Sequence, residues 1–159
     1  MISGTFEPVI FSIMTGIVSP FPENFTFNTE IPVRITDINY GNHAGNDSIL
    51  SIIHEARVQY LNSFGYSELD IGGAGLIMKD MAVEFKKEII YGDKIIAYVT
   101  AARFTKVSFD LYYRLEKISG SNQTIAVIAK TGMICYNYKD KKIAPLPAQA
   151  IEKLSGNKG

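Results

Sequence analysis

Cysteine is nearly absent from this chain of 159 residues, because Cys135 is the only one. A single cysteine cannot form an intrachain disulfide, and this favours a reducing, cytoplasmic location. Cys135 stands in a run of alternating apolar residues, which predicts a buried and unreactive thiol. Histidine is scarce too, with His43 and His54 alone. One cysteine and two separated histidines are too few for a usual zinc site, so we expect no metal.

Basic residues are missing from the first 33 positions, since the first lysine or arginine is Arg34. A secretory signal needs a positive region before its apolar run, and the run at 8–14 has none. Gly16 and two following prolines end that run well short of the roughly 18 to 20 apolar residues of a membrane span. We therefore expect no signal and no membrane partner. We interpret residues 1–25 as an N-terminal extension of uncertain order, with docking on the domain or on a partner chain left open.

An excess of either charge is also lacking, since 16 lysines and arginines balance 16 acidic residues. A neutral chain has no electrostatic basis for binding nucleic acid or an anionic membrane. No nucleophile elbow, phosphate-binding loop or dinucleotide fingerprint occurs. No repeat, low-complexity tract or linker divides residues 26–155, and apolar residues make up 47% of the chain. This composition predicts one globular domain over that range.

The strongest local signal is a helix, because apolar residues recur at spacings of three and four from Ile49 to Phe64. Asn46 or Asp47 can cap its start, and Gly65 is well placed to end it. A partly alternating segment at 25–35 precedes it and predicts a strand. Pro32 inside that segment argues for an edge strand or a late start.

Strand patterns follow the glycine-rich turn at 72–75. Alternating apolar residues and intervening turns predict four long strands and then a short closing helix, at 81–86, 95–101, 107–115, 125–138 and 148–154. Short connections between consecutive strands imply an antiparallel sheet. One long helix with a broad apolar face predicts an α+β layer in which the sheet wraps around the helix.

Such a sheet has faces and edges that one helix cannot cover. Long edge strands need pairing or blunting, because their unpaired backbone groups recruit other chains. We therefore predict a homodimer, with continuous sheets as one arrangement and a dimer of dimers as a larger one.

The densest polar segment joins the first strand to the helix. Residues 37–47 read Asp-Ile-Asn-Tyr-Gly-Asn-His-Ala-Gly-Asn-Asp. Turn formation and helix capping explain some of these residues, but they leave His43 and the density of polar groups unexplained. Farther along the helix, Glu55 falls beside the apolar face, at the boundary with the sheet or another subunit. A partly buried carboxylate there suits a general base, and a structural ion pair with Arg57 or an arginine of the sheet is the alternative.

These residues resemble a known family. The run at 33–37 (Val-Arg-Ile-Thr-Asp), then His43, Asn46 and the Glu-Ala-Arg triplet at 55–57, resemble the 4-hydroxybenzoyl-CoA thioesterase branch of the hotdog superfamily. Members carry a strand that ends in an Asp-x-Asp loop, a His-Val-Asn-Asn-like step and a helix that ends in Glu-Ala-Arg. The resemblance covers about residues 27–138. It implies a hotdog fold that hydrolyses acyl-CoA thioesters, with coenzyme A as part of the substrate and no separate cofactor. The spacing from His43 to Glu55 also resembles that in plant acyl-ACP thioesterases.

One position departs from the family pattern. Many members have a catalytic carboxylate at the second aspartate of Asp-x-Asp, and Asn39 stands there in this chain. A carboxamide is neither a base nor a nucleophile at neutral pH, although Asn39 can orient water or polarise the thioester carbonyl. The base must then come from Glu55, Asp47, Asp37 or His43. We expect Glu55 or Asp47 to activate water, with His43 and Asn39 orienting it.

The resemblance also implies where the substrate binds. Backbone N–H groups near Gly45 and the helix N-terminus are expected to bind the carbonyl oxygen, with Asn46 and Tyr40 as further substrate contacts. The acyl group is expected between helix and sheet, at a dimer interface. Surface lysines are candidates for the phosphates of coenzyme A, namely Lys86, Lys87 and Lys106.

Two other functions are consistent with the same fold. A hydratase or dehydratase of acyl thioesters is supported by the pair of His43 and Glu55. A non-catalytic subunit that binds acyl thioesters is supported by Asn39 at the usual acid position. Fold analogy alone cannot choose among the three functions.

Overall fold

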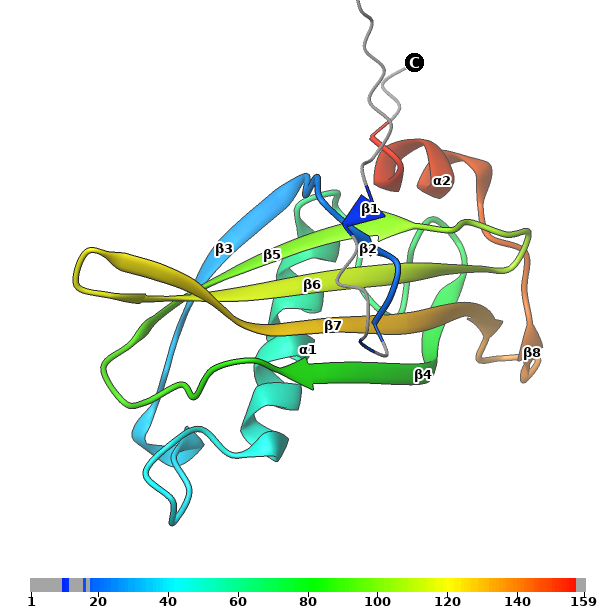
Figure 1. The fold of residues 1–159 in the computed structure, drawn as a ribbon. Helices are drawn as coiled ribbons and strands as arrows, with labels where there is room; N and C mark the ends of the chain where they lie inside the picture. Colours follow the sequence, from blue (N-terminus) through cyan, green and yellow to red (C-terminus); the bar gives the residue numbers. More distant parts are fainter. Residues whose placement is uncertain (1–9, 12–15, 17, 157–159) are drawn as a thin grey trace, which may run out of the picture.

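The computed structural model describes residues 10–11, 16 and 18–156. A curled sheet wraps around one long helix, α1, and a short helix, α2, closes one end of the core (Figure 1). The elements are β1 (Ile10–Phe11), β2 (Phe21–Pro22), β3 (Phe27–Pro32), a 3-10 turn η1 (Ile35–Asp37), α1 (Asn46–Asn62), β4 (Gly75–Phe85), β5 (Lys94–Ala102), β6 (Ser108–Ser119), β7 (Asn122–Asn137), β8 (Lys142–Ile143) and α2 (Ala148–Leu154). The predicted α+β layer and the closing helix are confirmed.

The sheet is antiparallel throughout, with the order β3-β5-β6-β7-β4, and β8 pairs with β7. The edge position predicted from Pro32 is confirmed, because this residue ends edge strand β3. β4 pairs with β7 and not with β5, the next strand in the sequence. The segment between β4 and β5 therefore crosses from one side of the sheet to the other, and its turn at 91–93 is not part of a hairpin.

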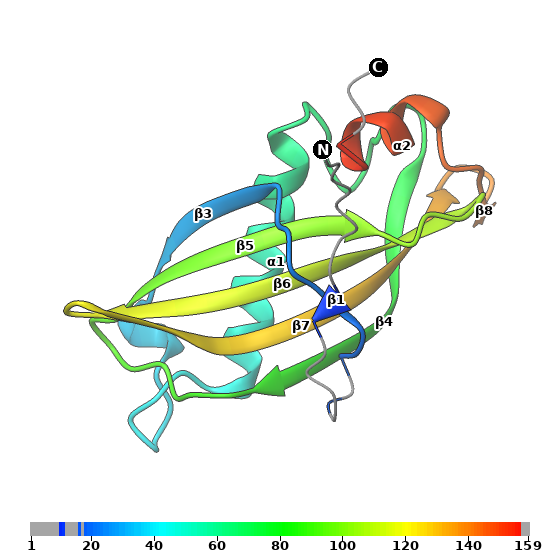
Figure 2. The same cartoon turned by 45° about the horizontal axis from the view of Figure 1, so that its top comes forward.

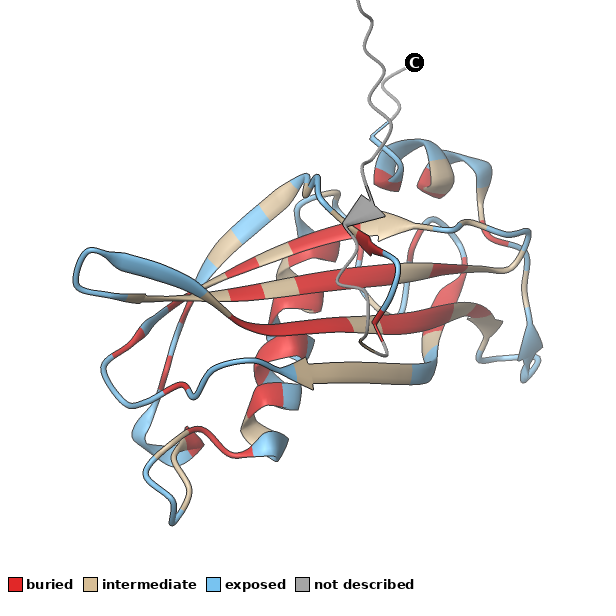
Figure 3. Cartoon of the chain, viewed as in Figure 1, coloured by how far each residue is buried: buried red, intermediate tan, exposed pale blue. Residues whose placement is uncertain are grey.

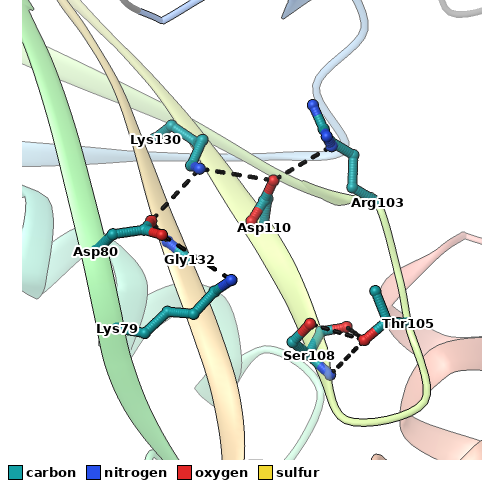
Figure 4. A network of polar contacts seen from close by, with 8 residues as sticks. All are labelled: Lys79, Asp80, Arg103, Thr105, Ser108, Asp110, Lys130 and Gly132. Carbon is teal, nitrogen blue, oxygen red and sulfur yellow. Dashed lines mark hydrogen bonds and ion pairs between the residues drawn. The ribbon is translucent and has the colours of Figure 1, made fainter.

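A register shift interrupts β4 between Met78 and Asp80. The Asp80 carboxylate compensates for it locally, because it accepts a hydrogen bond from the Gly132 N–H at 3.1 Å. The ammonium of Lys130 lies 3.4 Å from the same carboxylate (Figure 4). The irregular strand is thus pinned to β7 by side-chain contacts.

Helix α1 follows its apolar period. Its buried residues include the predicted ones, Ile49, Ile52, Ile53, Ala56 and Tyr60. The expected caps were wrong, since Gly45 is the N-cap and Asn46 and Asp47 form the first helical turn. A carboxylate in the first turn interacts favourably with the helix dipole, and glycine is tolerated at the N-cap. Gly65 was expected to end the helix, but α1 ends at Asn62 with Ser63 as its C-cap, and Gly65, at φ +79°, ends the turn that follows.

The main core lies between α1 and the concave face of the sheet. The predicted alternation is confirmed in β5, where Ile95, Ala97 and Val99 are buried. Cys135 is also buried there, and burial raises the pKa of its thiol to about 11. The thiol is therefore protonated at neutral pH, as expected for an unreactive cysteine.

The opposite face of the sheet is covered by the chain that leads into β3. Val18 and Phe21 are buried against Tyr112 and Ile128, and β2 crosses the sheet on the side away from α1 (Figures 1 and 2). Figure 3 shows buried residues along the middle of β5, β6 and β7. Parts of the predicted extension, residues 1–9, 12–15 and 17, lie outside the described residues.

A buried charge network joins α1 to the loop that precedes β4. Arg57 is 6% exposed, and its Nε donates to Glu68 at 2.7 Å. His54 contacts the other oxygen of Glu68 at 2.8 Å, and Arg57 also donates to the Tyr113 hydroxyl. Arg57 therefore pairs with Glu68, not with Glu55. Burial alone would raise the pKa of Glu68, but hydrogen bonds from His54 and Arg57 outweigh it and lower the pKa.

We expect Glu68→Gln to reduce the free energy of unfolding at pH 7 by about 1–3 kcal/mol, because a charged partner of buried Arg57 is lost. The pKa of Glu68 is lower in the folded state than its ordinary value of 4.5. The stabilisation is therefore present above that value and disappears as the pH falls through the lowered pKa. Urea denaturation at pH 7 and at stepwise lower pH checks this, with Glu152→Gln on the exposed side of α2 as control. A deficit that is independent of pH would contradict the ionic origin.

Candidate active site

The loop between η1 and α1 is fixed by its own backbone. The Asn39 N–H donates to the His43 carbonyl at 2.9 Å, and the Gly45 N–H donates to the Asp37 carbonyl at 3.0 Å. The Ala44 N–H donates to the Ile89 carbonyl at 2.7 Å, which ties the loop to the segment after β4. Side chains carried by this loop are therefore held in place relative to the helix and the sheet.

Asn39 lies between His43 and Asp47. Its Oδ1 accepts a hydrogen bond from the Gly41 N–H at 2.8 Å, which orients the amide. A methyl group added at Gly41 would lie 3.1 Å from His43 Nε2 and 3.2 Å from Asn39 Oδ1. One added at Gly45 would lie 2.7 Å from Asp47 Oδ1 and 3.5 Å from Asn39 Nδ2. The oxygen end of the Asn39 amide and the His43 imidazole thus both lie beside Gly41, whereas the nitrogen end of the amide and the Asp47 carboxylate lie beside Gly45. Neither Asn39 nor Asp47 lines the cavity at the start of α1.

His43 has a defined hydrogen-bonding role. Its Nδ1 lies 3.2 Å from the Ala44 carbonyl oxygen, which can only accept. In the neutral ring this contact places the proton on Nδ1 and leaves Nε2 as an acceptor. Nε2 is the atom nearest the Gly41 position and is 4.0 Å from Glu88. His43 can therefore accept a proton or a hydrogen bond from water beside Asn39.

The N-terminus of α1 adds hydrogen-bond donors to this site. First-turn N–H groups have no intrahelical acceptor, and the N-cap Gly45 has no side chain to bind them. These groups and the positive end of the helix dipole favour an oxyanion. A cavity of about 180 Å³ adjoins the helix start, with lining residues His43, Ala44, Asn46, Ile49, Phe85, Lys86, Lys87, Glu88, Ile89 and Val127.

Asp37 and Glu55 line a different cavity, of about 310 Å³, between β3 and α1. The Asp37 carboxylate is 4% exposed and accepts from the backbone N–H of Arg34 at 2.8 Å and from its guanidinium at 3.1 Å. Glu55 is exposed and accepts from Gln59 at 2.8 Å. Nine residues of helix separate Glu55 from Asn46, a rise of about 14 Å. Within one chain, Glu55 is therefore remote from His43.

The two predicted substrate contacts, Asn46 and Tyr40, differ in their position relative to the cavity. Asn46 lines the cavity at the helix start, whereas Tyr40 is fully exposed at the loop tip. Sequence reasoning missed the wall formed by residues 85–89, of which it named two lysines only as loose candidates. That segment directly follows the end of β4, and only the crossover of the chain brings it to the helix.

Metal and membrane features are absent from the part of the chain that the structure describes. No group of three histidine, cysteine or acidic side chains there could hold a metal ion. Neither helix of the described residues is long and apolar enough to cross a membrane.

Solved structures share this fold. A 1,4-dihydroxy-2-naphthoyl-CoA thioesterase from Synechocystis aligns with a TM-score of 0.71 and 21% identity, over 83% of this chain and 96% of that one. A mutant 4-hydroxybenzoyl-CoA thioesterase in complex with 4-hydroxybenzoyl-CoA aligns with a TM-score of 0.73 and 14% identity, over 81% and 98%. A Thermus thermophilus thioesterase in complex with coenzyme A and zinc aligns with a TM-score of 0.70 and 22% identity, over 85% and 98%. The chain therefore adopts the hotdog fold, as the resemblance implied.

Sequence comparison identifies the family. Residues 33–154 match the sequence model of the thioesterase-like superfamily, and the chain belongs to that superfamily. No curated protein sequence matches the chain.

We expect the two residues of the larger cavity to differ in their effect on stability. Asp37→Asn should lower the free energy of unfolding by about 1–3 kcal/mol, because a buried, doubly engaged carboxylate is lost. Glu55→Gln should change it by less than about 0.5 kcal/mol, as is usual for an exposed position. Chemical denaturation of both variants at pH 7 checks this. A stable Asp37→Asn variant would show that Asp37 is not a structural residue.

Proposed function

We propose that this protein hydrolyses an acyl-CoA thioester to the free acid and coenzyme A. The observation that carries the proposal is the Asn39 amide between the Asp47 carboxylate and the His43 imidazole, at the N-terminus of α1. This arrangement offers a base, an orienting amide and oxyanion donors at one end of α1. Membership of the thioesterase-like superfamily supports the same reaction class.

Asp47 is the base in this proposal. Of the three candidate carboxylates, Asp37 is engaged by Arg34, and Glu55 lies about 14 Å along the helix. Asp47 alone stands beside Asn39. It removes a proton from water as the water oxygen attacks the thioester carbon. Asn39 and His43 hold that water.

The helix start receives the developing charge. The thioester carbonyl oxygen binds first-turn N–H groups of α1 near Gly45, which stabilise the tetrahedral oxyanion. Collapse of this intermediate breaks the C–S bond, and the proton taken from water returns to the departing thiolate. The products are a carboxylic acid and the free thiol of coenzyme A.

The hydratase alternative has less support. It depended on His43 and Glu55 acting together, and within one chain these residues line different cavities. The hydratase alternative would regain support if a partner subunit brought His43 and Glu55 together. Hydration of an enoyl-CoA should therefore be measured in parallel with thiol release.

We expect Asp47→Asn to lower kcat for thiol release by about 10²- to 10⁴-fold, the usual contribution of general base catalysis. Glu55→Gln, on the same helix, should lower it by less than about threefold. Free-thiol release from short, long and aromatic acyl-CoAs measures both, with circular dichroism to verify folding. If activity were lost in Glu55→Gln instead, the base would be Glu55, which lines the larger cavity. Binding without turnover in the wild type would favour the non-catalytic subunit.

We further infer that two copies pair along β4. This 11-residue strand ends the sheet, and Met78 and Phe85 on it are about half exposed. Unpaired edges of this length recruit another strand. In an antiparallel pair the end of one β4 faces the start of the other. A partner would then close the cavity at Phe85, which gives the dimer-interface site expected from the sequence.

We expect Met78→Glu/Phe85→Glu to yield a folded monomer with little thiol release, because like charges would face the partner strand. Sedimentation velocity gives the oligomeric state, and Leu69→Glu, an exposed apolar position outside β4, is the control. A dimeric double variant would place the interface elsewhere.

A further inference from the structure

Glu84, near the end of β4, is held from two sides. Its Oε2 accepts a hydrogen bond from the Val18 N–H at 2.8 Å. Its Oε1 accepts one from the Lys86 ammonium at 2.8 Å. The side chain is 13% exposed. This carboxylate therefore joins the N-terminal segment to a lysine of the strand end.

The N-terminal segment, here Gly16 and Val18, lies close to that carboxylate. A Cβ atom at Gly16 would lie 1.9–2.3 Å from the carboxyl atoms of Glu84, so only glycine fits there while the carboxylate keeps its place. Val18 is buried against the outer face of the sheet. The position of the Glu84 carboxylate thus depends on how the segment docks.

Lys86 connects this outer face to the candidate active site. It lines the same cavity as His43 and Asn46, and its backbone N–H is fixed to the Ala126 carbonyl at 2.7 Å. Its ammonium has three donors, so contact with Glu84 leaves donors for a ligand. A cation that is already anchored loses less side-chain entropy when it binds an anion.

We propose that Glu84, fixed by the N-terminal segment, positions Lys86 to bind a phosphate of the coenzyme A moiety at the edge of the cavity. This inference rests on the proposed function. In acyl-CoA the pantetheine arm separates the thioester from the phosphates. The Lys86 ammonium fits the phosphate end, because Glu84 holds it toward the outer face of the sheet, whereas Asp47 lies at the start of α1 on the inner face.

The test compares one acyl group carried by coenzyme A and by pantetheine, which has no phosphate. Lys86→Met removes the ammonium and keeps an apolar chain of similar length. We expect it to raise KM for acyl-CoA by about 10-fold, the effect of one charged hydrogen bond. Glu84→Gln and Gly16→Ala, which release or displace the anchor, should raise it by about threefold. KM for acyl-pantetheine should stay within about twofold in all three, as expected where no contact is lost.

Asp80→Asn provides the matched control. It also removes an outer-face carboxylate of β4, one that contacts Lys130 and Gly132 and does not line the cavity (Figure 4). It should change neither KM. A rise of both KM values in Lys86→Met, or of neither, would overturn the proposal. So would a fall in KM for acyl-CoA in Glu84→Gln, because Glu84 would then mask the lysine and not position it.

Failure of the proposed function has a different signature. If the wild type released no thiol from either substrate, the proposed hydrolysis would be wrong. The phosphate contact could still be tested. Calorimetric binding of free coenzyme A then measures it, with the same fold-changes expected in Kd. Equal Kd values in wild type and Lys86→Met, or no binding by the wild type, would overturn the inference itself.

Discussion

Burial of one face of α1 against the concave side of the sheet is the interaction on which the rest of this molecule depends. Ile53, Ala56 and Tyr60 are fully buried there, and their burial sets both the rotation of the helix about its axis and the position of its N-terminus. The helix N-terminus lies beside the segment that crosses from β4 to β5. The hydrogen bond from Ala44 to Ile89 then joins the helix start to the crossover. A polar site at the helix N-terminus is thus placed both by apolar packing of the helix and by the backbone hydrogen bonds of its loop.

The polar side chains discussed above are of two kinds, those with a charged partner at hydrogen-bond distance and those without one. Asp37 with Arg34 and Glu68 with Arg57 are carboxylates whose partners are already in place. Such groups stabilise the fold and have little capacity left for a substrate. Asn39 instead lies near His43 at Gly41 and near Asp47 at Gly45. A buried ion pair and a catalytic carboxylate look alike in a sequence, and only the number of donors around each carboxylate tells them apart.

Periodicity predicted most of the fold, because burial acts on every third or fourth residue of a helix and every second residue of a strand. The edge position of β3 followed from Pro32, which has no backbone N–H to donate, whereas the register of α1 and the alternation of β5 followed from periodicity. Strand order did not, since the crossover after β4 leaves no local signal. The helix cap was also misjudged, because Asn46 and Asp47 are good caps and equally good first-turn residues. For the site, the sequence favoured Glu55 or Asp47 as the base over Asp37 and His43, and it could not show that Glu55 and His43 line different cavities.

A single helix leaves the second face and the edges of its sheet uncovered, and the chain deals with each differently. The outer face has a small apolar centre at Tyr112 and Ile128, which Val18 and Phe21 cover. Charged side chains surround that centre, and they include Glu84, whose contact with the Val18 N–H fixes the covering segment. The same carboxylate also accepts a hydrogen bond from the Lys86 ammonium. The edge at β4 has no such cover among the described residues, and it borders the same cavity. The covered face and the open edge therefore both adjoin the candidate active site, because Glu84 contacts Lys86 and both Phe85 and Lys86 line its cavity.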